Sequence, residues 1–199
     1  MEADGVFTSV RQALHVSFLM EIMPATGRSQ LQGILERLME EAGIVRELEK
    51  HERSIDFRGL SSLEVRAQCA MVVGSVNAHL VPPEQAAVLT RFGLRRRQAQ
   101  GVRALMDYVS PTLSTQHDTA CLAMAWGLFA REGRREDFSL NKIAAEFRLA
   151  RATLQRDQQK IGAYQKTLEE RAVRNLTPYF ERTGLVSPAR CNDESLQRG

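Results

Sequence analysis

Apolar residues recur every three or four positions along most of the chain, the spacing that places them on one side of a helix. The segments with this pattern cover residues 10–22, 29–50, 61–80, 82–91, 102–109, 115–129 and 139–175. Pro24 ends the first segment, and Ser61 and Glu64 form a capping box at the start of the third. Because no stretch has a convincing strand pattern, we predict an all-α helical bundle.

Breaks between the helical segments divide the chain into four parts. We expect an N-terminal helical segment over 1–58, a central helical region with a basic loop over 59–112, a helix-turn-helix domain over 113–186 and a flexible tail over 187–199. The length of 199 residues suits one sizeable domain or two small ones. The third part carries the clearest motif.

The segment SLNKIAAEFRLARATLQRDQQKI, residues 139–161, has the apolar layout of a C-terminal helix-turn-helix. The positions that we expect to pack inward are Ile143, Ala144, Phe147, Leu149, Leu154 and Ile161. Ala144 is small, as the crossing of the two helices requires, and Leu149 is expected to fill the turn. This layout predicts that the second helix projects far enough to enter a DNA major groove.

Two residues depart from the commonest form of this motif. Arg148 stands in the turn where glycine is usual, and a left-handed backbone there would be costly for a residue with a side chain. Asp157 stands at a position that is usually apolar. We expect either that a neighbouring helix end or an arginine accepts this carboxylate, or that the second helix is rotated.

The polar residues of the motif are candidates for DNA contacts. On this register the outward-facing residues that we expect to read bases are Arg151, Gln155, Arg156 and Gln159. Arginine can donate two hydrogen bonds to guanine, and glutamine can read adenine. The candidates for phosphate contacts are Ser139, Asn141, Lys142 and Lys160. The alternative is a plain helical hairpin whose polar faces are only solvated.

The charge is distributed unevenly, although the chain has 27 basic and 24 acidic residues and a net charge of only +3. Residues 91–103 contain five arginines and no acid, namely Arg91, Arg95, Arg96, Arg97 and Arg103. We treat these arginines as candidates for contacts with RNA or with RNA polymerase. A solvated loop is the alternative, and a GC-rich genome would also explain why only four of the basic residues are lysines.

Several classes of protein are not indicated by the sequence. The apolar runs are too short to cross a bilayer and no export segment is evident, so we expect a cytoplasmic protein without a membrane partner. Cys69, Cys121 and Cys191 lie far apart, without the spacing of a metal site. There is no phosphate-binding loop and no nucleophile signature, so we expect neither an enzyme nor a cofactor.

Four stretches of the chain resemble a known family of regulators. Residues 59–80, 119–131, 139–157 and 168–186 look like the phage Q-type late-gene transcription antitermination factors and the related bacterial regulators of self-lysis genes. The resemblance extends over about residues 55–186. It implies a prophage-related regulator of cell lysis whose helix-turn-helix residues bind DNA.

The resemblance also implies a mechanism and a set of partners. Such a factor binds double-stranded DNA at a promoter and engages RNA polymerase that is paused nearby under the influence of the sigma factor. It then stays on the polymerase core as a collar at the RNA exit channel, which keeps terminator hairpins from forming. Nascent RNA is therefore a further candidate partner. The number of copies on DNA, one or two, is left open.

Two other functions are compatible with the sequence. The first is a promoter-bound helix-turn-helix activator or repressor that does not travel with polymerase. The second is a helical adaptor between proteins, in which an acidic helix over residues 29–52 and the basic face contact partners. Readthrough of a terminator would distinguish the first from an antitermination factor, and sequence-specific DNA binding would exclude the second.

Overall fold

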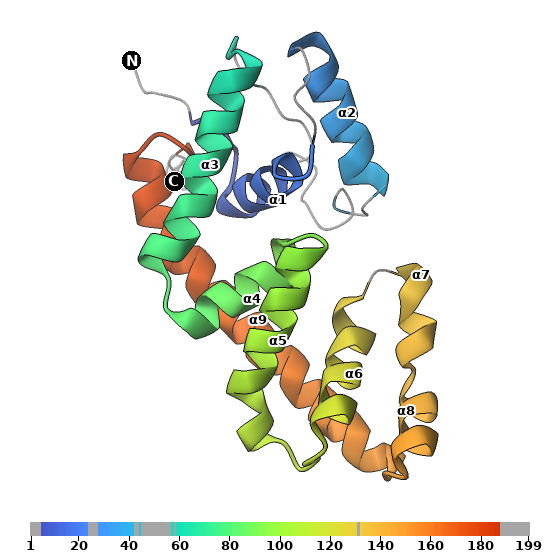
Figure 1. Cartoon of the computed structure of the whole chain (residues 1–199). Coiled ribbons are helices and arrows are strands. Elements are labelled where there is room, and N and C mark those ends of the chain that lie inside the picture. Colours follow the sequence, from blue (N-terminus) through green and yellow to red (C-terminus); the bar gives the residue numbers. More distant parts are fainter. Residues whose placement is uncertain are drawn as a thin grey trace, which may run out of the picture.

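A computed structural model of the protein describes residues 5–23, 28–41, 44, 57, 59–130 and 132–187. All regular elements in these residues are helical, which confirms the all-α prediction (Figure 1). They are α1 (Val10–Met20), α2 (Arg28–Glu41), α3 (Ser62–His79), α4 (Pro82–Phe92), α5 (Arg96–Val109), η3 (Ser110–Thr112), α6 (Asp118–Phe129), α7 (Glu132–Arg135), η4 (Glu136–Phe138), α8 (Leu140–Phe147) and α9 (Arg151–Arg182), where η denotes a short 3₁₀ helix. Apart from Ile44, the predicted extension of the second helix to residue 50 lies outside the described residues, and so does the predicted tail beyond 187.

Local signals account for several helix ends. The hydroxyl oxygen of Ser61 accepts a hydrogen bond from the Glu64 amide at 3.3 Å, and the Glu64 carboxylate accepts one from the Ser61 amide at 2.7 Å. This is the predicted capping box of α3. Pro82 begins α4, where its missing N–H costs nothing.

Two helices are longer than predicted. α5 starts at Arg96, so most of the predicted basic loop is helical, as its alanine, glutamine and arginine residues favour. α9 runs for 32 residues and continues past Pro178, although a proline removes one helix hydrogen bond. Leu176 and Phe180, on either side of Pro178, are fully buried, and their burial explains why the helix does not stop there.

The buried apolar residues form two cores. The first core joins α1, α2 and α3 to the end of α4 and the C-terminal part of α9, and the second joins α5, α6 and α8 to the N-terminal part of α9. Ala86 and Ala87 of α4 belong to the second core. α9, about 48 Å long at 1.5 Å per residue, passes along both (Figure 1). The cores therefore combine residues from different parts of the predicted division, and the segment 113–186 contributes to both.

A polar junction lies on α9 between the two cores. The buried carboxylate of Glu169 pairs with Arg11 of α1, lies 3.9 Å from Arg91 Nε of α4, and accepts a hydrogen bond from Gln165 at 2.9 Å. A second buried carboxylate, that of Glu84 on α4, pairs with α9 residues. Because a buried charge is costly without partners, these contacts fix how α1, α4 and α9 meet.

The two ends of the described chain also meet. The amide of Phe7 donates to the carbonyl of Leu185 at 2.8 Å, and the amide of Ser187 donates to the carbonyl of Phe7 at 3.3 Å. Phe7 and Val186 form an isolated parallel bridge. These bonds hold the segment before α1 against the segment that comes after α9.

His15 of α1 is a buried titratable group near Arg11 and Arg91, the two arginines that contact Glu169. Its ring packs edge-on against Phe92, with 4.6 Å between the ring centroids. Burial, together with the positive charges of Arg91 and Arg11, lowers the pKa of His15 from 6.5 to about 3. The folded chain therefore holds this imidazole in its neutral form at neutral and mildly acidic pH.

We predict that His15 makes the fold less stable in mild acid. The unfolded chain takes up a proton at this residue below pH 6.5, whereas the folded chain does so only near pH 3. The contribution of the neutral ring is therefore lost progressively as the pH falls, by about 2 kcal/mol at pH 5. Unfolding in urea at pH 7 and at pH 5 measures this loss in the free energy of unfolding. His15→Leu should show a smaller loss over this range, and an unchanged loss would contradict the prediction.

Candidate nucleic-acid interface

α8 and α9 are joined by a tight turn at residues 148–150. Arg148 ends α8 with φ 52° and ψ 43°, which is the left-handed conformation that glycine usually provides in this motif. The amide of Leu149 donates to the carbonyl of Ala144 at 3.1 Å, so the last turn of α8 is closed. This turn directs α9 away from α8 and is possible for arginine only at some conformational cost.

The inner face of this pair of helices matches the predicted pattern. Ile143, Leu154 and Ile161 are buried in the second core. Ala144, Phe147 and Leu149 are partly buried and pack against the same core. The apolar spacing of residues 139–161 was therefore a correct guide to which residues point inward.

The opposite face of α9 is open to solvent. The four residues expected to read bases, Arg151, Gln155, Arg156 and Gln159, are all exposed. None of the four side chains has a hydrogen bond or ion pair with another residue of the described ranges. These guanidinium and amide groups are therefore available to an external partner.

The start of α8 lies next to this face in the sequence and is also polar. Ser139 is the N-cap residue of α8, but its side chain makes no capping hydrogen bond. Asn141 and Lys142 are exposed in the first turn. The first amides of a helix have no partner within the helix, and they carry the positive end of its dipole. This end of α8 is therefore suited to hold an anionic group.

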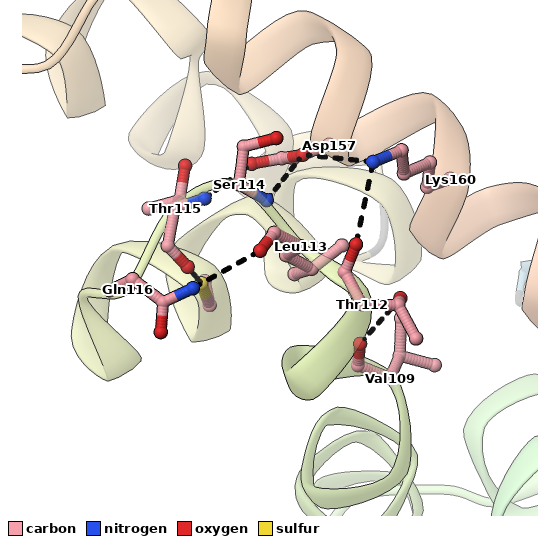
Figure 2. Close-up of polar contacts among 9 residues, drawn as sticks. Val109, Thr112, Leu113, Ser114, Thr115, Gln116, Asp157 and Lys160 are labelled. Carbon is pink, nitrogen blue, oxygen red and sulfur yellow. Dashed lines mark hydrogen bonds and ion pairs between the residues drawn. The ribbon is translucent and has the colours of Figure 1, made fainter.

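Asp157 faces inward from α9, and its side chain is 0% exposed (Figure 2). Its carboxylate accepts hydrogen bonds from the backbone amides of Ser114 at 3.1 Å and Thr115 at 2.8 Å. Burial alone would raise the pKa of Asp157, but the hydrogen bonds from this loop and the positive charge of Lys160 hold it below its usual value. The sequence suggested a helix end or an arginine as the partner, but the structure instead shows the loop before α6.

Further contacts keep that loop in place, as Figure 2 shows. The Gln116 side chain donates to the Leu113 carbonyl at 3.2 Å, and the Lys160 ammonium donates to the Thr112 carbonyl at 3.4 Å. The N-cap residue of α6 is His117, whose ring nitrogen accepts a hydrogen bond from the Ala120 amide at 3.4 Å. The backbone amides of Ser114 and Thr115 instead donate to the Asp157 carboxylate.

α6 supports both helices of the pair. The Gln158 side chain of α9 donates to the Met124 carbonyl of α6 at 3.2 Å. On the other side a Cβ atom at Gly127 would lie 2.7 Å from the carbonyl oxygen of Phe138, so α6 approaches η4 more closely than a larger residue allows. The side of α9 opposite its exposed face thus packs against α6 and against the loop that precedes α6.

The five arginines of residues 91–103 are not arranged as one continuous loop. Arg91 ends α4, Arg95 precedes α5, and the other three lie on α5. Arg91 contributes to the Glu169 junction, and Arg97 pairs with Glu21, the residue that follows α1, at 2.9 Å. Arg95, Arg96 and Arg103 are exposed. A role of this cluster in contacts with RNA or polymerase stays a prediction.

Two of the three cysteines lie in the described ranges. Cys69 and Cys121 are buried, and burial raises the pKa of each thiol to about 11, so neither is a reactive thiolate at neutral pH. Cys191 lies outside these ranges. Within them no group of histidine, cysteine and acidic side chains could hold a metal ion, and no helix is both long and apolar enough to cross a bilayer.

The chain was compared with models of known protein families and with curated proteins. No model of a known protein family matches the chain, and no curated protein matches it either. The resemblance to late-gene antitermination factors therefore stays a prediction. A functional proposal for this chain rests on the geometry and charge of the residues just described.

We predict that Arg148→Gly stabilises the protein. Glycine adopts the left-handed conformation of this turn without the contact between Cβ and backbone that other residues suffer. Arg148→Ala is the matched control, because it also removes the charge but keeps the Cβ atom. We expect the free energy of unfolding in urea to be about 1 kcal/mol higher for Arg148→Gly than for Arg148→Ala. Equal stability of the two variants would contradict a strained turn.

We predict that Asp157→Ala destabilises the second core. The change leaves the buried amide of Thr115 and the partly buried amide of Ser114 without an acceptor, which costs about 3 kcal/mol in the free energy of unfolding. The exposed neighbour Gln155 provides the control, since Gln155→Ala should change the stability by less than about 0.5 kcal/mol. Chemical denaturation measures both variants. The account of this loop fails if Asp157→Ala is as stable as Gln155→Ala.

Proposed function

We propose that this chain is a sequence-specific DNA-binding transcription regulator and that α8 and the start of α9 are its helix-turn-helix. One observation carries the proposal. Arg151, Gln155, Arg156 and Gln159 form an exposed face of α9 without partners among the described residues, while Leu154, Asp157 and Ile161 hold the opposite face in place. A face that reads bases needs both properties, because its side chains must be free and its helix must not move.

The chemistry of this face suits the edges of base pairs. A major groove about 12 Å wide admits a helix, and the N-terminal residues of the second helix then meet the bases. Arg151 and Arg156 can each donate two hydrogen bonds to guanine, and Gln155 and Gln159 can bond with adenine. In this arrangement only the first turns of α9 enter the groove.

The surrounding charges suit the phosphate backbone. Lys142, Arg148 and Lys160 are exposed beside the four residues, and Ser139 and Asn141 add polar groups at the start of α8. The one acid on the second half of this motif, Asp157, is buried and bound to the loop. Basic groups at the rim of the face supply the affinity that does not depend on sequence.

We further propose that the protein acts as an antitermination factor, which loads from its DNA site onto promoter-proximally paused RNA polymerase and collars the RNA exit channel. Support for this step comes from the resemblance of four stretches, over about residues 55–186, to the late-gene antitermination family. A promoter-bound regulator would use the same face of α9. The two functions therefore share the DNA-binding step and differ in whether the protein then moves onto polymerase.

We predict sequence-specific binding that depends on Arg156. A preferred duplex is first selected from random sequences, and its affinity should fall with salt at a log–log slope of about −4, as expected for four or five phosphate contacts. Arg156→Ala should reduce discrimination between the selected and mixed sequences by about 1–3 kcal/mol. Arg174→Ala, at an exposed position further along α9, is the control and should retain it. No preference for any sequence would favour the protein adaptor instead.

We also predict terminator readthrough on a template with the selected site at its promoter. Transcription in vitro with RNA polymerase core and sigma factor should give more RNA beyond a downstream terminator when the protein is present. Arg156→Ala should lose the effect, because loading starts at the DNA site. Specific binding without readthrough would identify a regulator that stays at the promoter.

A further inference from the structure

A cavity separates the N-terminal helices from α5, α6 and η4, and it lies apart from the exposed face of α9. Its volume is about 490 Å³, within the range of about 300–1,000 Å³ that is typical of sites for small molecules. Its walls come from α1, α2, the start of α5, the end of α6 and the segment up to η4. We propose that this cavity binds a small organic anion with an aromatic body.

The apolar residues that line the cavity are the reason why we expect the ligand to carry an aromatic group. The apolar lining includes Leu19 of α1, Leu38 of α2, Trp126 of α6 and Phe138 of η4. Trp126 is only partly buried. A large aromatic side chain at the edge of a cavity gains contact area when a flat apolar group enters.

The polar residues that line the cavity are the reason why we expect the ligand to be negatively charged. Arg95 and Arg134 line the cavity, both are exposed, and neither has an ion pair with a residue that the structure describes. No aspartate or glutamate is among the described residues of the lining. Gln98 also faces the cavity, and its amide nitrogen is occupied by the carbonyl of Phe129 at 2.9 Å. The site thus offers two arginine side chains to an anion, and arginine binds carboxylate and related groups through paired hydrogen bonds.

The backbone of Arg95 gives an independent indication of a functional site. Its φ of 49° and ψ of −114° are a combination that residues with a side chain rarely adopt. Backbone strain of this kind is concentrated at ligand sites and active sites. Arg95 is also the N-cap of α5, so the positive end of this helix dipole lies at the same end of the cavity. A strained arginine, where glycine would fit more easily, indicates that its side chain is needed there.

The test uses 8-anilinonaphthalene-1-sulfonate, a fluorescent aromatic anion, as the probe. Trp126 is the single tryptophan of the chain and lines the cavity, so its emission reports directly on occupancy. We expect saturable binding of one dye per chain, with transfer of excitation from Trp126 to the dye. Absence of saturable transfer, or binding of many dyes per chain, would overturn the proposal.

Variants test the role of the two arginines. Arg95→Gln and Arg134→Gln should each weaken dye binding about tenfold, because each removes a charged donor. Arg103→Gln, on the exposed part of α5 outside the cavity, is the matched control and should bind as the unaltered protein does. The neutral analogue N-phenyl-1-naphthylamine should be insensitive to all three changes. Unchanged dye affinity in Arg95→Gln and Arg134→Gln, with unfolding midpoints like that of the control, would contradict anion recognition.

Discussion

The buried carboxylate of Asp157 determines which side of α9 faces the protein. It lies between Leu154 and Ile161 on the inner face, and its two hydrogen bonds to the amides of the loop before α6 compensate for its burial. Because residues three or four apart share a side of a helix, this arrangement turns Gln155 and Gln159 to solvent. A rotation of α9 about its axis would separate this carboxylate from the amides of Ser114 and Thr115, so these groups would lose their partners.

The length of α9 links this face to the rest of the molecule. Its first half belongs to one apolar core and its second half to the other, and the carboxylate of Glu169 at the transition is paired with arginines from α1 and α4. The two cores are therefore joined through a continuous helix and through the ion pairs of a buried carboxylate with two partly exposed arginines. The end of α9 that we propose to read DNA is thus continuous with the part of the helix that packs against the N-terminal helices.

Periodicity alone was enough to predict the helical class, the inward residues from Ile143 to Ile161 and the exposure of Arg156 and its neighbours, because these depend on local spacing. The partner of Asp157 could not be predicted, since the loop amides lie more than 40 residues away in the sequence. Long-range burial also explains why α9 continues through Pro178. The cavity beside Trp126 was not predicted, since it is formed where distant helices come together.

The most direct test of the proposed DNA-binding face is to map where DNA touches the protein. Amide signals of the isotope-labelled protein should be monitored by nuclear magnetic resonance while a short mixed-sequence duplex is added at low ionic strength. Our account places the largest shifts in residues 139–160, from the start of α8 through the third turn of α9. Shifts centred on α1, α2 and α3 with none in that segment would contradict it.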